Sequence, residues 1–238
     1  MKITYIHHSS FSVELENAVL LFDYFKGTLP EFPAGKPLFI FASHFHADHY
    51  DPVIFQLGEK RENVFYILSK EIGKRIPEEY RKRYKDGIRL VKAGERFCLN
   101  ISEESLIVET FHSTDEGVAF WLSCEGKEIY HAGDLNNWWW EGEDMAWNRN
   151  MAASYKQEMK KLSGRTADLA FIPVDPRLEQ WFYLGAAGFM EQADTKWIFP
   201  MHFWEDYTII PKLIEHPSSE GWRDRIVEIH KEGEEFIR

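Results

Sequence analysis

The stretch His44-Phe45-His46-Ala47-Asp48-His49 decides how the rest of this sequence is interpreted. It directly follows the apolar run 38–41, and it holds three of the chain's ten histidines together with a carboxylate. Imidazole nitrogens and carboxylate oxygens are ligands that suit zinc, iron and manganese. Four such donors on one short loop are too many for a single tetrahedral ion that also takes ligands from elsewhere. The spacing therefore predicts two half-sites, with His44 and His46 at a first metal and Asp48 and His49 at a second.

The length allows one large domain or two small ones, of which we expect a single domain, residues 1–238, and the composition suffices for a substantial core. Of the 238 residues, 44% are hydrophobic and 16% are aromatic, and the formal net charge is −11. The sequence lacks the basic stripe of a nucleic-acid binder and the run of about 18 apolar residues that spans a membrane. Its two cysteines, Cys98 and Cys124, are too few for a disulfide framework, and its start lacks the apolar region of a signal peptide. We therefore expect a cytoplasmic protein without nucleic-acid or membrane partners.

Short apolar runs alternate with helical patterns along the chain. Strands are expected at 3–5, 11–15, 19–22, 38–41, 64–68, 88–91, 96–101, 105–111, 118–122, 128–130, 169–174, 197–200, 226–229 and 235–237. Helices are expected from 51 to about 60, within 69–85, over about 143–162 and near 179–192. The order of strands, a helix and further strands occurs twice. This predicts the α+β class, with mixed sheets that carry helices on their outer faces.

Three further donors follow strand-like runs elsewhere in the sequence. His112, Asp134 and His202 each stand where an apolar run ends, so all three are expected at one edge of the sheets, where loops carry function. The simplest assignment gives His112 to the first metal and His202 to the second. Asp134 would bridge the two, since a carboxylate has two oxygens and two-metal sites hold their ions ~3.5–4 Å apart. The predicted metal ligands are therefore His44, His46, Asp48, His49, His112, Asp134 and His202.

This ordered set of motifs resembles the metallo-β-lactamase superfamily, and the resemblance spans essentially the whole chain. It implies a four-layer αββα sandwich of two pseudo-symmetric halves with a metal site at one edge. The start Ile6-His7-His8-Ser9-Ser10-Phe11 and the segments 113–117, 131–134 and 173–177 resemble the branch that contains ascorbate-6-phosphate lactonase and small metal-dependent hydrolases. In the wider superfamily the third histidine usually follows glycine, whereas here Phe111 precedes His112. Asp115 is therefore an alternative ligand for the first metal.

A pair of metals that shares a water lowers the pKa of that water and polarises a substrate oxygen. The predicted function is hydrolysis of an ester, lactone, amide or phosphoester bond in a small, anionic metabolite. Asp48 is expected either to orient the water and accept its proton or to serve purely as a ligand. His8 is expected either as a second catalytic residue at the cavity or as a hydrogen-bonding residue behind it.

Four more residues are candidates for substrate contact or for support of the ligands. Asp175 either tethers a ligand histidine or forms an Asx turn before Pro176. Arg177 would favour an anionic group such as phosphate or carboxylate. Trp138 begins a run of three tryptophans, at least one of which is expected to line the pocket or a subunit interface. Tyr207 is a further candidate for substrate contact.

Two other function classes stay open at this point. A nuclease of the same superfamily would carry the same metal motifs, although the acidic charge and the lack of a long insertion count against it. A non-hydrolytic redox or metal-binding member is the other alternative, although the redox branch typically carries a carboxylate where His46 stands. We expect two divalent metal ions as cofactors, zinc first, with manganese or iron as alternatives. The expected partner is a small-molecule substrate, which the sequence does not identify, and exposed tryptophans are compatible with a homo-oligomer.

Overall fold

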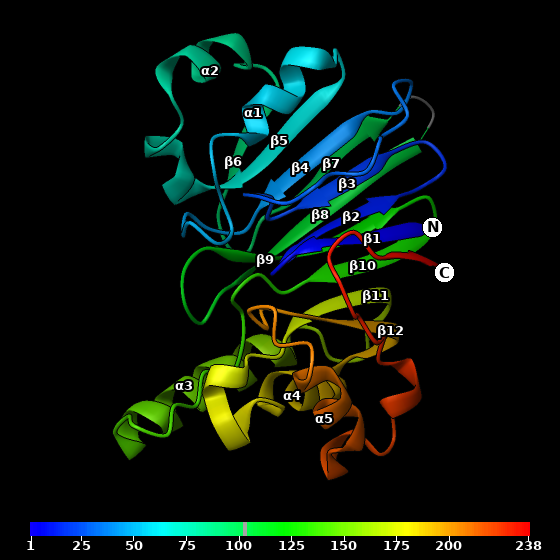
Figure 1. Cartoon of the computed structure of the whole chain (residues 1–238). Helices are drawn as coiled ribbons and strands as arrows, with labels where there is room; N and C mark the ends of the chain where they lie inside the picture. The colour runs from blue at the N-terminus through cyan, green and yellow to red at the C-terminus, as the bar shows by residue number, and fades with distance from the viewer. Residues whose placement is uncertain (102–103) are drawn as a thin grey trace.

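Two β-sheets form the centre of the molecule (Figure 1). The computed structural model describes residues 1–101 and 104–238. The first sheet has seven strands in the order β13-β1-β2-β3-β4-β5-β6, and the second has six in the order β12-β11-β10-β9-β8-β7. The strands of the first sheet are β1 (Lys2–His7), β2 (Ser10–Glu14), β3 (Val19–Phe22), β4 (Leu38–Ala42), β5 (Val64–Ser69), β6 (Ile88–Val91) and β13 (Glu235–Ile237). Those of the second are β7 (Arg96–Ile101), β8 (Glu104–His112), β9 (Val118–Cys124), β10 (Lys127–His131), β11 (Thr166–Pro173) and β12 (Asp194–Met201).

Both sheets follow the same plan, in which antiparallel strands lead into parallel ones. In the first sheet β1, β2 and β3 pair antiparallel, and β3 to β6 pair parallel. In the second sheet β7 to β10 pair antiparallel, and β10 to β12 pair parallel. This repeated plan agrees with the prediction of two similar halves.

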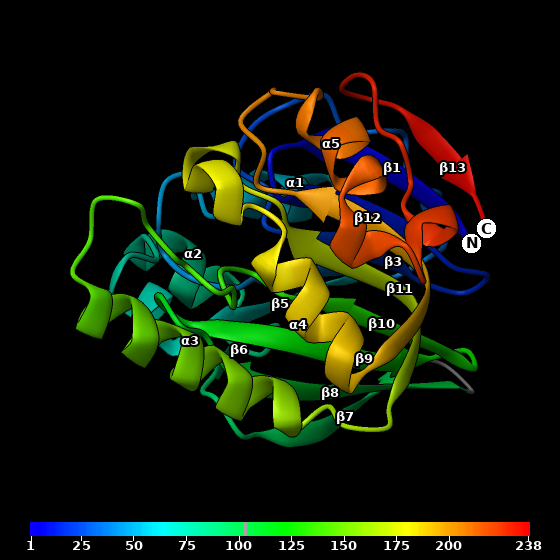
Figure 2. The ribbon, with the colours of Figure 1, turned by 90° about the horizontal axis from the view of Figure 1, so that it is seen from below.

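The helices cover the outer faces of the two sheets. They are α1 (Ile54–Leu57), α2 (Glu78–Arg83), α3 (Met145–Lys160), α4 (Leu184–Gln192) and α5 (Ile209–Glu215), with short 3-10 segments η1 (Gly58–Lys60), η2 (Lys70–Lys74), η3 (Pro176–Trp181), η4 (Pro217–Ser219) and η5 (Arg223–Arg225). Figure 2 shows α3, α4 and α5 over the second sheet, whereas α1 and α2 lie beyond the first (Figures 1 and 2). The order of layers is helix, sheet, sheet, helix, as predicted. None of the described helices is long and apolar enough to cross a membrane.

Side-chain alternation explains why the short apolar strands are buried on both faces. In β3, Leu20 and Phe22 join the main core, while Val19 and Leu21 join a second cluster that includes Phe55 of α1. Successive side chains of a strand point to opposite faces, so each such strand contributes to the layers on both sides of it. Aromatic contacts join the sheets across the main core, for example Phe11 with Phe171 at 4.6 Å between ring centroids.

Three of the predicted elements differ from the observed ones. The expected helix from 51 to about 60 is the short α1 followed by η1, and the expected helix within 69–85 is split into η2 and α2. Pro77 stands between these two, where its ring disfavours helix in the preceding residue. The segment 226–229 forms an isolated bridge from Ile226 to Ile198 rather than the expected strand. This segment is a loop whose apolar side chains Ile226, Val227 and Ile229 are all buried.

Candidate metal centre

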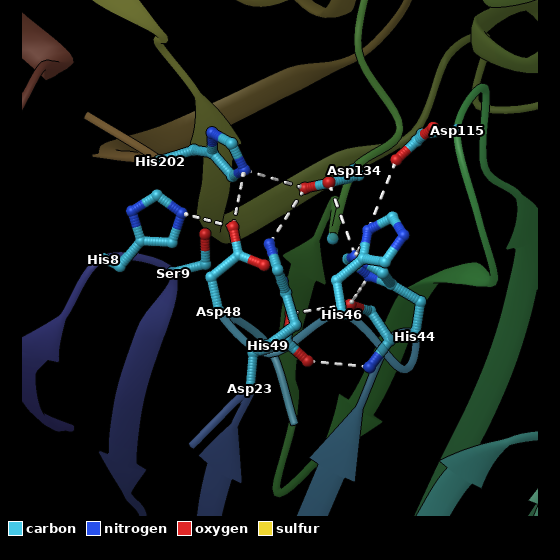
Figure 3. A network of polar contacts seen from close by, with 12 residues as sticks. His8, Ser9, Asp23, His44, His46, Asp48, His49, Asp115, Asp134 and His202 are labelled. Carbon is cyan, nitrogen blue, oxygen red and sulfur yellow. Dashed lines mark hydrogen bonds and ion pairs between the residues drawn. The ribbon is translucent and has the colours of Figure 1, made fainter. Parts of the chain in front are cut away.

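Six of the seven metal ligands predicted from the sequence gather at one edge of the two sheets (Figure 3). The loop after β4 carries the segment 44–49, Asp134 follows β10, and His202 follows β12. Because β10, β11 and β12 are parallel, their carboxyl ends meet at the same edge of the second sheet. The donors there form two groups of four, and within each group the ligand atoms lie within 4.8 Å of one another.

The first group consists of His44, His46, Asp115 and Asp134. His44 Nε2 lies 3.0 Å from His46 Nδ1 and 3.5 Å from Asp134 Oδ2. Asp115 Oδ2 lies 3.7 Å from His46 Nδ1. The side chains of His46 and Asp115 are 40% and 46% exposed, so this first half-site opens to solvent.

The second group consists of His8, Asp48, His49 and His202. Asp48 Oδ2 lies 3.5 Å from His8 Nε2 and 3.9 Å from His202 Nε2. The three histidines are buried, and Asp48 is the member of the group with access to solvent. This second half-site is therefore the enclosed one.

Asp134 lies between the two half-sites. Its Oδ2 faces His44, while its Oδ1 lies 3.2 Å from His49 Nε2 and 3.4 Å from His202 Nε2. Asp134 Oδ1, His49 Nε2 and both ring nitrogens of His8 are buried without a hydrogen-bond partner among the described residues. Such unpaired buried atoms are costly, and Asp134 Oδ1, His49 Nε2 and His8 Nε2 face other donors at the spacing of ligands on one ion. The residues therefore fit two divalent cations bridged by Asp134, and ligation itself stays a prediction.

Two glycines let the chain bring Asp115 and Asp134 close to His44. Gly117 has a φ of +73°, and a Cβ there would lie 2.0 Å from the carbonyl oxygen of Ser43. Gly133 has a φ of +51°, and its Cβ would lie 2.6 Å from that of Ser43. Glycine is the residue that tolerates both the positive φ and the close backbone approach. Asp115 precedes β9 and Asp134 follows β10, and these two strands pair antiparallel. Both carboxylates therefore reach the histidine loop from the same end of this strand pair.

The structure places His112 away from both half-sites, which corrects its assignment to the first metal. His112 is the last residue of β8, and Phe111 before it packs into the main core. The next side chain along a strand points to the opposite face. His112 is accordingly exposed, and its backbone N–H donates to Glu158 of α3 at 3.3 Å. Asp115, the alternative from the sequence, is the residue that joins the first group.

Buried carboxylates hold the outer nitrogens of two of the histidines. Asp23 Oδ2 lies 2.7 Å from His49 Nδ1, and Asp175 Oδ2 lies 2.9 Å from His202 Nδ1. These contacts direct the Nε2 atom of each histidine toward Asp134. Asp175 meets both of its predictions, since it also accepts a hydrogen bond from the Arg177 backbone N–H at 2.8 Å. Asp23 was not predicted, because its one signal in the sequence is its place directly after the apolar run 19–22.

Burial and neighbouring charges set the protonation of the donors. Burial lowers the pKa of His8 to about 4 and that of His44 to about 3. Burial opposes ionisation of Asp134, but His49 and His202 outweigh it and hold the pKa of Asp134 well below its ordinary value. Burial also disfavours a charged His49, but Asp134 and Asp23 outweigh it and raise the pKa of His49 well above its ordinary value. Neutral imidazoles and ionised carboxylates are the ligand forms, so His49 would release a proton on binding a metal.

Comparison with known proteins identifies the family. The model of the beta-lactamase superfamily domain matches residues 2–202. The chain belongs to the metallo-β-lactamase superfamily. A metal-dependent hydrolase of Alkaliphilus metalliredigens is 24% identical to it over 247 aligned positions, which cover 97% of this chain and 96% of that relative.

Solved structures show the superfamily fold over the length of the chain. A metallo hydrolase of Ignicoccus hospitalis has a TM-score of 0.64 at 18% identity, and the match covers 99% of this chain and 97% of that one. A structure named as a metal-dependent hydrolase of Parabacteroides distasonis has a TM-score of 0.62 at 21% identity, covering 96% and 92%. At these identities the likeness establishes the fold, which is the one predicted.

The candidate metal centre opens into a cavity of about 270 Å³ that touches both half-sites. Trp138 forms part of its wall, as predicted: its Nε1–H donates to the carbonyl oxygen of Asp134 at 2.9 Å, and its ring meets that of His202 edge-on. Arg177 also faces the cavity, and its guanidinium pairs with Asp175 at 2.5 Å. The lining residues are His46, Asp48, Asp115, Asp134, Trp138, Trp140, Trp147, Met151, Arg177 and His202.

Tyr207 does not take the predicted place at the cavity. Its ring packs against Phe203 and Tyr5, with centroids 5.3 and 6.3 Å away. The cavity lining in the described part of the chain does not include it. Its position near His202 in the sequence was a misleading signal, because this partly buried ring packs against the main core and not into the cavity.

Proposed function

We propose that this metal-dependent hydrolase of the metallo-β-lactamase superfamily uses two divalent metal ions to cleave an ester, lactone or phosphoester bond in a small metabolite. The observation that carries the proposal is the sharing of Asp134 by two four-donor groups beside one open cavity. Zinc is the first candidate for the metal, with manganese or iron as alternatives, because imidazole and carboxylate suit all three.

The donor sets assign a role to each ligand residue. His44, His46 and Asp115 would hold one ion, and Asp48, His49 and His202 the other, with Asp134 between them. When bound, the ions would supply an activated water at neutral pH and polarise the carbonyl or phosphoryl oxygen. Asp175 and Asp23 keep His202 and His49 in the tautomer that presents Nε2 to the site.

Asp48 is the residue that we assign to proton transfer. Burial raises the pKa of Asp48, but its contacts with His8 and His49 outweigh it and hold that pKa below its ordinary value. The carboxylate is therefore ionised at neutral pH. Its Oδ2 faces His8 Nε2 and His202 Nε2 at 3.5 and 3.9 Å, and Oδ1 would orient the attacking water and take its proton. The side chain also lines the cavity, where a substrate would lie.

The rest of the cavity indicates what it binds. Ligand pockets typically measure ~300–1,000 Å³, so a cavity of about 270 Å³ suits a small molecule. One side carries Trp140, Trp147 and Met151, which would cover an apolar part of the substrate. Arg177 stands near the metal ligands and supports an anionic group on the substrate. Cytoplasmic location, the absence of nucleic-acid partners and homo-oligomer formation stay predictions from the sequence.

The test is a hydrolysis screen on protein loaded with zinc or manganese. Suitable probes are p-nitrophenyl esters, a set of lactones, and mono- and bis-p-nitrophenyl phosphate. His46→Ala and Asp134→Ala should lower kcat/KM by at least about 100-fold, because loss even of an outer partner of a metal ligand costs ~10–100-fold. His112→Ala is the matched control and should keep wild-type activity. Wild-type rates in both ligand variants would reject the two-metal proposal.

A further inference from the structure

We propose that His8 is itself a metal ligand, and that it makes the second half-site the tighter of the two. The inference rests on the proposed function, because it assigns one more donor to the same centre. It replaces the acid–base role considered for His8, since a nitrogen bound to a metal cannot also transfer a proton. The ligand at this position would be a divalent cation such as zinc.

The backbone holds His8 in a conformation that is costly for a side-chain-bearing residue. His8 has a φ of +53° in the turn between β1 and β2. Its N–H donates to Tyr5 Oη at 3.0 Å, and its carbonyl oxygen accepts from the His202 N–H at 3.3 Å. A left-handed residue without glycine persists where its surroundings enforce it, and such residues cluster at functional sites. The second bond ties His8 directly to another ligand of the same half-site.

The imidazole of His8 is buried and unsatisfied. It is 1% exposed, and in the described part of the chain neither Nδ1 nor Nε2 has a hydrogen-bond partner. Nε2 lies 3.5 Å from Asp48 Oδ2, which is long for a hydrogen bond. Two donors that each lie about 2.1 Å from one ion are separated by about 3.0–3.5 Å. The observed separation is therefore that of two ligands on a shared cation, and a cation would satisfy the orphaned nitrogen.

Aromatic rings pack against the His8 imidazole and separate it from solvent. The His202 ring lies 4.2 Å from the His8 ring, and Trp204 covers it from outside at 4.3 Å between centroids (Figure 3 shows His8 and His202). Trp204 also has a positive φ, of 49°, and its indole lies under the Arg177 guanidinium at 4.9 Å. This cover shields His8 from bulk water, so solvent does not compensate the missing hydrogen bonds.

The two half-sites consequently differ in strength. The second has four protein donors besides Asp134, and its three histidine side chains are at most 3% exposed. The first has three besides Asp134, of which His46 and Asp115 are 40% and 46% exposed. Solvent weakens electrostatic attraction at the exposed half-site more than at the enclosed one. The first zinc equivalent should therefore enter the half-site of His8, and the second should be the exchangeable one.

The experiment is a zinc titration of metal-free protein in competition with a chromophoric chelator, without substrate. Wild type should bind two equivalents in two steps. His8→Ala should weaken the tighter step by more than the ~10–100-fold that loss of an outer partner costs, while His46→Ala should weaken only the looser step. His112→Ala is the matched control, because His112 lies outside both donor groups; it should leave both steps unchanged.

The outcomes separate this inference from the proposed function. If wild type binds no zinc, the two-metal function fails. If wild type binds two equivalents and His8→Ala binds both with wild-type affinity, only the assignment of His8 fails. Circular dichroism of the metal-free variants checks the fold, and His8→Gln replaces His8→Ala if the alanine variant does not fold. The glutamine variant keeps a polar side chain but removes the imidazole ligand, so it should lose the tighter step as well.

Discussion

Asp23→Asn tests the arrangement behind the metal centre. Asp23 is fully buried, and its carboxylate accepts from the Ser43 N–H at 2.7 Å, the Ser43 hydroxyl at 2.6 Å and His49 Nδ1 at 2.7 Å. Asparagine keeps the shape but replaces one acceptor oxygen by an NH₂ group that only donates. If its oxygen stays with the Ser43 N–H, the NH₂ faces His49 Nδ1 and favours the tautomer with the proton on Nε2. The nitrogen that faces Asp134 would then be blocked for a metal.

The expected effect is moderate on stability and larger on metal binding. A hydrogen bond to a charged group contributes ~1.5–3 kcal/mol, so the free energy of unfolding of the metal-free protein should fall by about 2 kcal/mol. Zinc affinity should fall ~10–100-fold, as for other outer partners of ligand histidines. Urea denaturation measures the first quantity, and zinc titration against a chelator measures the second.

Asp168→Asn is the matched control. Asp168 lies near the other end of β11 and accepts from the Lys196 ammonium at 2.7 Å and the Glu128 N–H at 2.9 Å. Its substitution should lower stability without changing zinc affinity. For Asp23→Asn, unchanged zinc affinity together with an unfolding free energy within ~0.5 kcal/mol of wild type would refute the reasoning.

Four further predictions concern other parts of the molecule. Chelation should lower the unfolding midpoint and zinc should restore it, since a ligand at 100 times its Kd adds ~2.7 kcal/mol; a midpoint insensitive to chelator in calorimetry would contradict bound metals. Trp147→Ala should raise KM more than it lowers kcat in steady-state kinetics, because Trp147 lines the cavity without belonging to a donor group; an unchanged KM would remove it from substrate binding. Gly117→Ala should destabilise the protein by ~1 kcal/mol or more in urea, since its Cβ would lie 2.0 Å from the Ser43 carbonyl oxygen at a φ of +73°; wild-type stability would show that the loop relaxes freely. Burial raises the pKa of Asp168, but its lysine partner and a backbone N–H outweigh burial and lower that pKa. The stability difference between wild type and Asp168→Asn should therefore be full at neutral pH and vanish as pH falls below about 4. A difference in urea midpoint that persists at low pH would contradict this.

Local sequence patterns were sufficient to predict an element where the hydrophobic pattern of one segment, or the end of one strand, decides the structure. The apolar run 38–41 and the donors directly after it predict a buried strand that ends in a metal-binding loop, and β4 ends at Ala42 just before that loop. Asp134 and His202 were predicted in the same way, because parallel strands present their carboxyl ends at one edge. The loop at 226–229 shows the limit of this approach, since apolar residues alone do not distinguish a strand from a packed loop.

The errors arose where several elements had to be placed relative to one another. His112 and Asp115 are three residues apart, and both are metal-binding residue types. Which of the two lies at the first half-site depends on the face of the sheet to which the last side chain of β8 points. It also depends on the close approach of Gly117 to Ser43. Asp23 carries no motif around it, and its importance follows only from the arrival of His49 and Ser43 from another segment.

The sequence by itself predicted the α+β class, six residues that the structure gathers in or between two groups, and the division of the 44–49 loop between these groups; the six are His44, His46, Asp48, His49, Asp134 and His202. These follow from short-range rules, namely alternation along a strand and the chemistry of residues at strand ends. The tertiary structure decided that Asp115 and not His112 completes the first group, that His8 joins the second, and that Asp23 and Asp175 orient two of the histidines. The physical reason is that these choices depend on distances between side chains that are remote in sequence, which only the packing of the two sheets sets.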